Sequence, residues 1–218
     1  NTMLNQTTSI LLESGLNSPD TVQLKEPFPM LVAHDLLSAD IAEDLDRDFP
    51  RYRGAGYLPY EAADCGPRMI SQVEEMMAPP FAAAIGERLG LPDLGQYPNM
   101  VTICRSLNHR HGNIHTDSNS KIATALLYLN PDWMQTSEGC LRFLEQGDDF
   151  EATVVPEIRP LYGTLAAFRR ADNSWHGHLP FQGERRVIQI AWLTSEEEKL
   201  RKTKRGRMAR ILKAVTST

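Results

Sequence analysis

The second half of this chain carries six short β-prone runs, and they constrain its fold more than any other feature. The runs cover residues 100–104, 122–129, 140–144, 153–155, 165–168 and 187–193. Turns separate them at spacings of roughly ten to twenty residues, a pattern typical of an antiparallel sandwich or barrel. Helical patterns come earlier, over 68–77 and 81–89, and end at Pro or Gly residues. Helices before residue 95 and strands after it predict an α+β fold with a mainly β core.

The length of 218 residues suits one domain with terminal additions. We expect a loosely ordered arm or edge strand over 1–26, helical support over 27–95, the β core over 96–194 and a C-terminal helix over 195–218. Ser195 and Glu198 form a capping box that predicts the start of this last helix. Eight Lys or Arg residues and no acid lie between 199 and 213. The helix therefore presents either a solvated basic face or a docking surface for an acidic partner.

Composition argues against several classes of function. The net charge of −5 and the pI near 5.7 give no nucleic-acid signature. No apolar run approaches the roughly 18 residues that span a bilayer, so we expect no membrane partner. Cys65, Cys104 and Cys140 are widely spaced and odd in number. They predict reduced thiols in a cytoplasmic protein. The sequence does not decide between a monomer and a homodimer.

His115 and Asp117 stand two residues apart, and on a strand such side chains point to the same face. With His176 they would supply two imidazoles and one carboxylate, the set that non-haem Fe(II) oxygenases use to hold iron on one face. The H-T-D triplet alone more often marks a surface turn, so the motifs downstream decide. His178 lies two residues beyond His176 and is its rival for the third place.

Five further motifs follow the H-T-D triplet in a fixed order. They are T-x-L-L-Y-L-N-x-D-W at 124–133, E-G-x-L-R-F at 138–143, G-T-L-x-x-F at 163–168, W-H-G at 175–177 and G-E-R-R at 183–186. In this order they resemble the Fe(II)- and 2-oxoglutarate-dependent dioxygenases, and within them the prolyl-4-hydroxylase-like branch. The likeness covers about residues 100–193. It implies a double-stranded β-helix, a jelly-roll or cupin-like barrel, with N-terminal helices packed on the larger sheet.

The resemblance also implies a chemistry. Fe(II) would be held by His115, Asp117 and His176, with 2-oxoglutarate as co-substrate, O2 as oxidant and ascorbate as an optional stimulant. The reaction would hydroxylate an unactivated C–H bond of a peptidyl or free amino acid resembling proline, or of a small metabolite, and release succinate and CO2. The alternatives are a non-catalytic metal-binding sensor or scaffold and a cupin-type binding protein. The complete set of ligands and a candidate carboxylate-binding arginine speak against both.

In this family an Arg or Lys on the strand after the distal His holds the far carboxylate of 2-oxoglutarate, and here Arg185 and Arg186 compete for that role. By alternation Arg186 shares a face with Ile188 and Ile190, which is suited to packing under helices, whereas Arg185 shares the more polar face of Gln189. We therefore prefer Arg185. Tyr128 matches a family tyrosine that binds the same carboxylate, and Thr124 is a further candidate for a co-substrate contact. Arg105 departs from the family, which often has a Tyr at this place, and it would bind the substrate, bind a co-substrate carboxylate or face solvent.

Substrate contacts are expected from three residues close to the ligands in sequence, Asn113, Trp175 and His178. Two loops, 50–66 and 106–114, are rich in Gly, aromatic or basic residues and flank the motif region. We expect one of them to close over the substrate.

Overall fold

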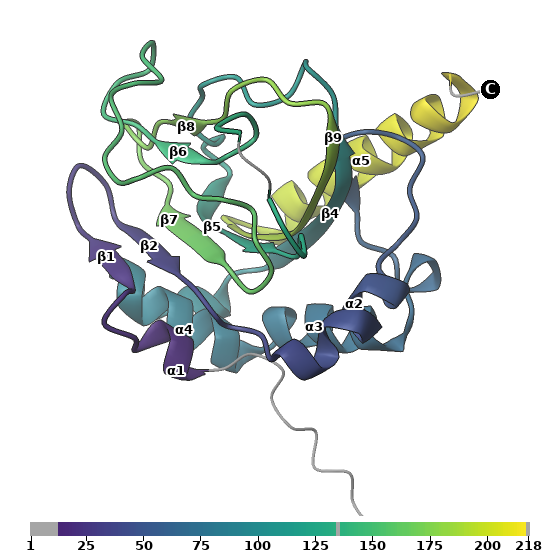
Figure 1. The fold of residues 1–218 in the computed structure, drawn as a ribbon, viewed down its shortest axis with the longest axis horizontal. Coiled ribbons are helices and arrows are strands. Elements are labelled where there is room, and N and C mark those ends of the chain that lie inside the picture. Colours follow the sequence, from purple (N-terminus) through teal and green to yellow (C-terminus); the bar gives the residue numbers. More distant parts are fainter. Residues whose placement is uncertain (1–12, 134–135, 217–218) are drawn as a thin grey trace, which may run out of the picture.

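The computed structural model describes residues 13–133 and 136–216. Its strands are β1 (Val22–Leu24), β2 (Met30–Ala33), β3 (Tyr57–Pro59), β4 (Asn99–Leu107), β5 (Lys121–Tyr128), β6 (Arg142–Phe143), β7 (Leu165–Arg169), β8 (His176–Gly177) and β9 (Gly183–Leu193). Antiparallel pairing orders seven of them as β1-β2-β7-β5-β9-β4-β3, while β6 and β8 form a small second sheet. Figure 1 shows the small sheet facing the large one. This is the barrel that the sequence predicts.

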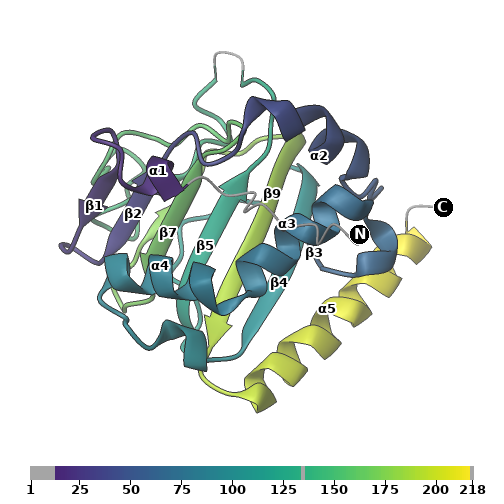
Figure 2. The same ribbon diagram turned by 90° about the horizontal axis from the view of Figure 1, so that it is seen from below.

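Most of the helices lie on the far side of the large sheet. They are α1 (Glu13–Leu16), α2 (Ala42–Asp48), α3 (Pro67–Met77), α4 (Pro79–Leu89) and α5 (Glu196–Thr216), with short 3-10 turns at Ala39–Ile41, Ala62–Asp64 and Leu94–Gln96. Pro67 and Pro79 occupy first helical positions, where their missing N–H groups leave no hydrogen bond unmade. Helix α4 ends at Gly90, whose φ of 71° is left-handed. Figure 2 shows α3 and α4 lying across the face of the sheet.

Alternation along β9 separates the two faces of the large sheet. Ile188, Ile190 and Trp192 are fully buried in the core between sheet and helices, where Trp192 stacks on Phe81 with ring centroids 6.1 Å apart. Burying each such side chain contributes roughly 1.5–3 kcal/mol. Val187 belongs to a second core between the two sheets. The predicted assignment of residues to the two faces of β9 is therefore confirmed. The face opposite the helices can line a site between the two sheets.

Helix α5 follows the edge of the large sheet beside β3 and β4 (Figure 2). Half of the predicted capping box is present: the Ser195 hydroxyl accepts a hydrogen bond from the Glu198 N–H at 3.2 Å, while the Glu198 carboxylate accepts hydrogen bonds from Arg201. The helix covers Glu196–Thr216, close to the expected range of 195–218. No helix in the described ranges is long and apolar enough to cross a membrane.

Three local expectations are corrected. Residues 50–66 are not all loop, because 57–59 form the edge strand β3 against β4. The run 153–155 makes no strand and contributes one isolated bridge, from Thr153 to Leu144. The run 140–144 shrinks to the two residues of β6. Of the expected arm over 1–26, β1 forms an edge strand, whereas residues 1–12 lie outside the described part.

Candidate metal and co-substrate site

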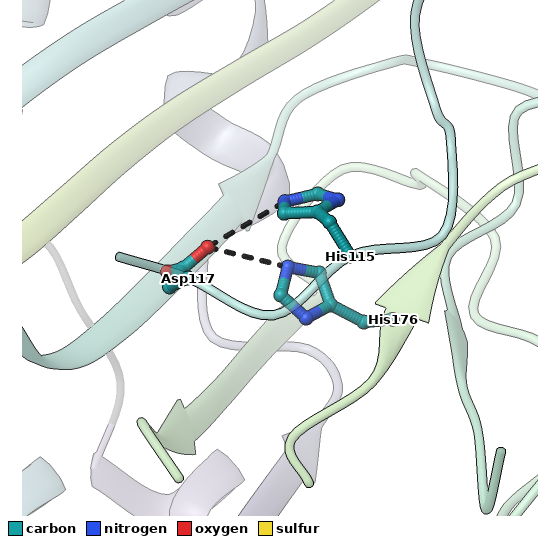
Figure 3. A group of neighbouring side chains, drawn as sticks. All are labelled: His115, Asp117 and His176. Atoms are coloured by element: carbon teal, nitrogen blue, oxygen red, sulfur yellow. Dashed lines mark ion pairs between the residues drawn. The ribbon is translucent and has the colours of Figure 1, made fainter. Parts of the chain in front are cut away.

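Two backbone hydrogen bonds bring the distant ligands together. The His115 N–H donates to the His176 carbonyl at 3.0 Å, and the His176 N–H donates back at 3.0 Å. His115 and Asp117 lie on an extended segment between β4 and β5 rather than on a strand, and His176 opens β8. Their side chains nevertheless converge as predicted. Asp117 Oδ1 lies 3.6 Å from His115 Nε2 and 3.5 Å from His176 Nε2 (Figure 3).

The orientation of both imidazoles suits a metal ion. His115 Nδ1 donates to the Asn113 carbonyl at 2.8 Å, and His176 Nδ1 donates to the Ser174 carbonyl at 2.9 Å. Because a carbonyl oxygen can only accept, each ring carries its proton on Nδ1 and keeps the Nε2 lone pair for a ligand. The two nitrogens and the carboxylate oxygen all lie within 4.8 Å of one another. The residues present therefore fit a divalent cation of the Fe(II) type.

Electrostatics keep the third ligand ionised. Burial alone would raise the pKa of Asp117, but its contacts with His115 and His176 and the charge of Lys121 hold this pKa well below its usual range. The contact with Asp117 also raises the pKa of His115. Protons and a metal ion therefore compete for the Asp117 carboxylate and the His115 imidazole.

A cavity of about 340 Å³ lies between the two sheets, and it contains these three residues. Thr124, Tyr128, His178 and Arg185 also line it, as expected for a site on this face. Gly112 at the cavity wall has a φ of 96°, and a side chain there would clash with the His178 ring. Burial, followed by the charge of Arg185, lowers the pKa of His178 to about 4, so this ring is neutral at physiological pH.

Arg185 is only 2% exposed and points into the cavity. Its Nε donates to the Gly139 carbonyl at 2.8 Å, and its two terminal nitrogens donate to the hydroxyls of Tyr57 at 3.2 Å and Tyr128 at 3.5 Å. Its guanidinium also lies over the Tyr128 ring, 5.2 Å from the centroid. Within the described residues no carboxylate pairs with this buried cation. A guanidinium has five N–H donors, so two remain for a bidentate carboxylate.

Arg186, by contrast, points away from the cavity. It forms ion pairs with Asp46 and Glu184, and its guanidinium lies over the Phe49 ring. Arg105 lies in the same outer group, with Glu184 at 2.8 Å and the Phe49 ring beneath it. Neither arginine lines the cavity, so their placement gives no support to a co-substrate role.

Of the three residues expected to contact the substrate, one lines the cavity and two do not. His178 lines the cavity, but Asn113 is exposed and only its carbonyl serves the site, by holding His115. The Trp175 ring packs against Gly147, on the opposite side of the chain from His176. Sequence reasoning also missed residues that line the cavity: Tyr57, Thr102, His111 and Lys121, whereas Gln189 lines it as its face of β9 predicts. No sequence pattern indicated Lys121, because its contact with Asp117 depends on the turn at 118–120.

Known proteins share this fold. Residues 101–194 match the family model described as the 2OG-Fe(II) oxygenase superfamily. A prolyl-4-hydroxylase from Pseudomonas putida is 18% identical with a TM-score of 0.51, and covers 76% of this chain and 92% of its own. A prolyl hydroxylase from Trichoplax adhaerens, solved with a hypoxia inducible factor oxygen degradation domain peptide fragment, is 16% identical with a TM-score of 0.52, over 78% and 86%. The viral collagen prolyl hydroxylase of Paramecium Bursaria Chlorella virus-1, solved as a 2OG complex, is 15% identical with a TM-score of 0.52, over 76% and 96%. No curated protein sequence matches the chain.

Proposed function

Residues 101–194 make this chain a member of the 2OG-Fe(II) oxygenase superfamily, and from that premise we propose that it hydroxylates an unactivated C–H bond. The enzyme is a 2-oxoglutarate-dependent dioxygenase whose cofactors are Fe(II), 2-oxoglutarate and O2. We propose a peptidyl or free amino acid resembling proline, or a small metabolite, as the substrate, with release of succinate and CO2.

One observation carries the proposal. Two imidazoles with free Nε2 atoms and one carboxylate converge in the same cavity as a buried arginine that has no carboxylate partner among the described residues. His115, Asp117 and His176 would hold Fe(II), and Arg185 with Tyr128 would bind the far carboxylate of 2-oxoglutarate. When bound, Fe(II) supplies the redox chemistry that couples oxidation of the co-substrate to oxidation of the substrate by O2.

The protein's own part is to orient its ligands and exclude water. Leu126, Leu141 and Phe168 line the cavity and belong to the core between the sheets. Their apolar surface lowers the local dielectric constant, so the charged groups that line the cavity act strongly on a bound anion. His178 also lines the cavity, and its neutral imidazole adds no charge.

The nature of the primary substrate is the finer part of the proposal. The Trichoplax adhaerens relative was solved with a peptide fragment, and the viral relative is a collagen prolyl hydroxylase. These relatives support a peptidyl substrate here, whereas selectivity depends on loops that a shared fold does not determine. We also propose an acidic partner for the exposed basic residues of α5, and a cytoplasmic location.

Succinate release tests the activity. Purified protein with Fe(II), 2-oxoglutarate and O2 should form succinate, and a screen of peptides and metabolites should yield a substrate that gains one oxygen by mass spectrometry. Asp117→Ala should abolish succinate formation, because two neutral imidazoles hold Fe(II) poorly. Asp148→Ala is the matched control, since Asp148 is an exposed carboxylate outside the cavity.

The same assay separates the alternatives. A metal-binding sensor or scaffold would bind Fe(II) and 2-oxoglutarate without forming succinate. A cupin-type binding protein would bind the metal, and this binding would not depend on Arg185. Full turnover by Asp117→Ala at limiting iron would refute the ligand assignment itself.

A further inference from the structure

The two oxygens of the Asp117 carboxylate have different surroundings. Oδ1 faces both imidazoles, at 3.6 Å from His115 Nε2 and 3.5 Å from His176 Nε2. Oδ2 accepts a hydrogen bond from the Thr124 hydroxyl at 2.7 Å and lies 3.3 Å from Lys121 Nζ. The carboxylate is 5% exposed, so both donors act in a poorly hydrated environment.

Both donors come from one rigid element. Lys121 and Thr124 lie on β5, which is hydrogen-bonded to β7 on one side and β9 on the other. Thr124 is 2% exposed, and the Lys121 side chain is 18% exposed. Arg170 adds a third restraint, since its Nε donates to the Asp117 carbonyl at 3.0 Å. The Asp117 side chain therefore cannot rotate without breaking contacts to a central strand.

We propose that Thr124 and Lys121 are positioning residues that restrict Asp117 to binding a metal through one oxygen. The inference rests on the proposed metal site, and it gives Thr124 a different role from the co-substrate contact expected from sequence. A carboxylate free to bind through both oxygens would occupy one more coordination position. Holding Oδ2 in hydrogen bonds keeps that position open for the co-substrate or O2.

The two donors differ in what their removal should do. The Thr124 hydroxyl is neutral, so Thr124→Val removes only the hydrogen bond and preserves the side-chain shape. Lys121 also carries a positive charge that opposes a nearby metal cation, so Lys121→Met loses orientation and relieves repulsion together. We therefore expect a smaller effect on affinity for Lys121→Met than for Thr124→Val.

Co(II) is the probe, because its visible absorption reports coordination number and its binding can be titrated without turnover. Thr124→Val should weaken Co(II) binding about 10- to 100-fold, the usual effect of losing a hydrogen bond to a metal ligand. Its spectrum should also change toward a higher coordination number. Thr124→Ser keeps the hydroxyl and should behave as the wild type.

Thr102→Val is the matched control. Thr102 lines the same cavity, its hydroxyl makes no hydrogen bond in the described structure, and it does not contact Asp117. This variant should leave both the Co(II) affinity and the spectrum unchanged. If Thr124→Val fails to fold, Lys121→Met replaces it, because the Lys121 ammonium makes its contact at the cavity wall and should still change the spectrum.

The outcomes separate this proposal from the function it rests on. If the wild type binds Co(II) and both Thr124→Val and Lys121→Met keep its spectrum, the positioning role is refuted and the metal site stands. If the wild type binds no Co(II), the metal site and the positioning role are both refuted. A changed spectrum in Thr102→Val as well would show a general effect of cavity substitutions and would also refute the specific role.

Discussion

Replacement of Arg185 by Ala is the most direct test of how the cavity binds 2-oxoglutarate. Arg185 is 2% exposed, and three hydrogen bonds fix its guanidinium in the cavity with two N–H groups left over. Removing a buried cation from a bound carboxylate costs roughly 2–5 kcal/mol, or about 30- to several-thousand-fold in affinity. We therefore expect Arg185→Ala to raise the dissociation constant for 2-oxoglutarate by that factor. The loss should appear mainly in the KM for 2-oxoglutarate.

The measurement is calorimetric titration of 2-oxoglutarate into the anaerobic Fe(II) protein. Arg185→Lys should recover only part of the affinity, because an ammonium keeps the charge but lacks the two parallel N–H groups. Arg186→Ala is the neighbouring control, since Arg186 pairs with Asp46 and Glu184 outside the cavity. Its affinity for 2-oxoglutarate should be that of the wild type.

Thermal melting adds an independent reading. Without co-substrate, Arg185 is a buried charge with no carboxylate partner within the described ranges, so its desolvation cost offsets its hydrogen bonds. Arg185→Ala should therefore leave the melting temperature of the metal-free protein nearly unchanged. Added 2-oxoglutarate should stabilise the Fe(II) wild type and not this variant. Loss of affinity in Arg186→Ala but not in Arg185→Ala would reverse the face assignment of β9 and refute the reasoning.

Three further predictions concern the ligands, the loops and the response to acid. His176→Ala should abolish Fe(II) binding in a competition assay with a chromophoric chelator, whereas His178→Ala should retain it; the reverse would exchange their roles. Substrate added to the Fe(II) and 2-oxoglutarate complex should protect loop 50–66 or loop 106–114 from hydrogen exchange, and unchanged exchange in both would remove the idea of a closing loop. The hydrogen bond from Arg47 outweighs burial and lowers the pKa of Asp48, so this carboxylate stabilises the fold above its unfolded-state pKa and loses that effect as the pH falls. Asp48→Asn should accordingly lower the free energy of unfolding by about 0.2–1 kcal/mol near pH 7 and by less below about pH 4 in denaturant titrations.

Alternation predicted the faces of β9 because each face has a different environment. Ile188 and Ile190 must meet the helices, and a shift of one residue would turn both toward the cavity and place residues of the cavity face, such as Gln189, under the helices. The same constraint turns Arg185 toward the cavity. Periodicity is informative wherever one side of a strand is buried under helices and the other lines a site.

Sequence reasoning failed where long-range pairing makes the structure. Tyr57 lies on β3, a three-residue edge strand that contains Pro59 and follows two glycines. These local signals favour a loop, and only pairing with β4 makes the segment a strand. Its hydroxyl consequently reaches Arg185, a contact between residues far apart in the chain.

Proximity in sequence misled the substrate assignments for a related reason. Trp175 precedes His176 on an extended segment, and adjacent side chains on such a segment point to opposite sides. The ring of Trp175 therefore meets Gly147 while His176 enters the cavity. Lys121 was missed because its contact with Asp117 depends on the turn at 118–120, whose shape no periodic pattern encodes.

The charges of the cavity link the metal to the co-substrate. Asp117 is the one carboxylate among its described lining residues, against two cations, Lys121 and Arg185. With neutral imidazoles the cavity therefore carries one excess positive charge. Fe(II) would add two positive charges, and the dianion 2-oxoglutarate would add two negative charges. Because these charges lie in a partly dry cavity, the dianion should bind more tightly once the metal is present. By linkage the metal must then gain the same free energy from the co-substrate. The two cations thus disfavour a metal ion bound alone, and they favour the metal and its co-substrate bound together.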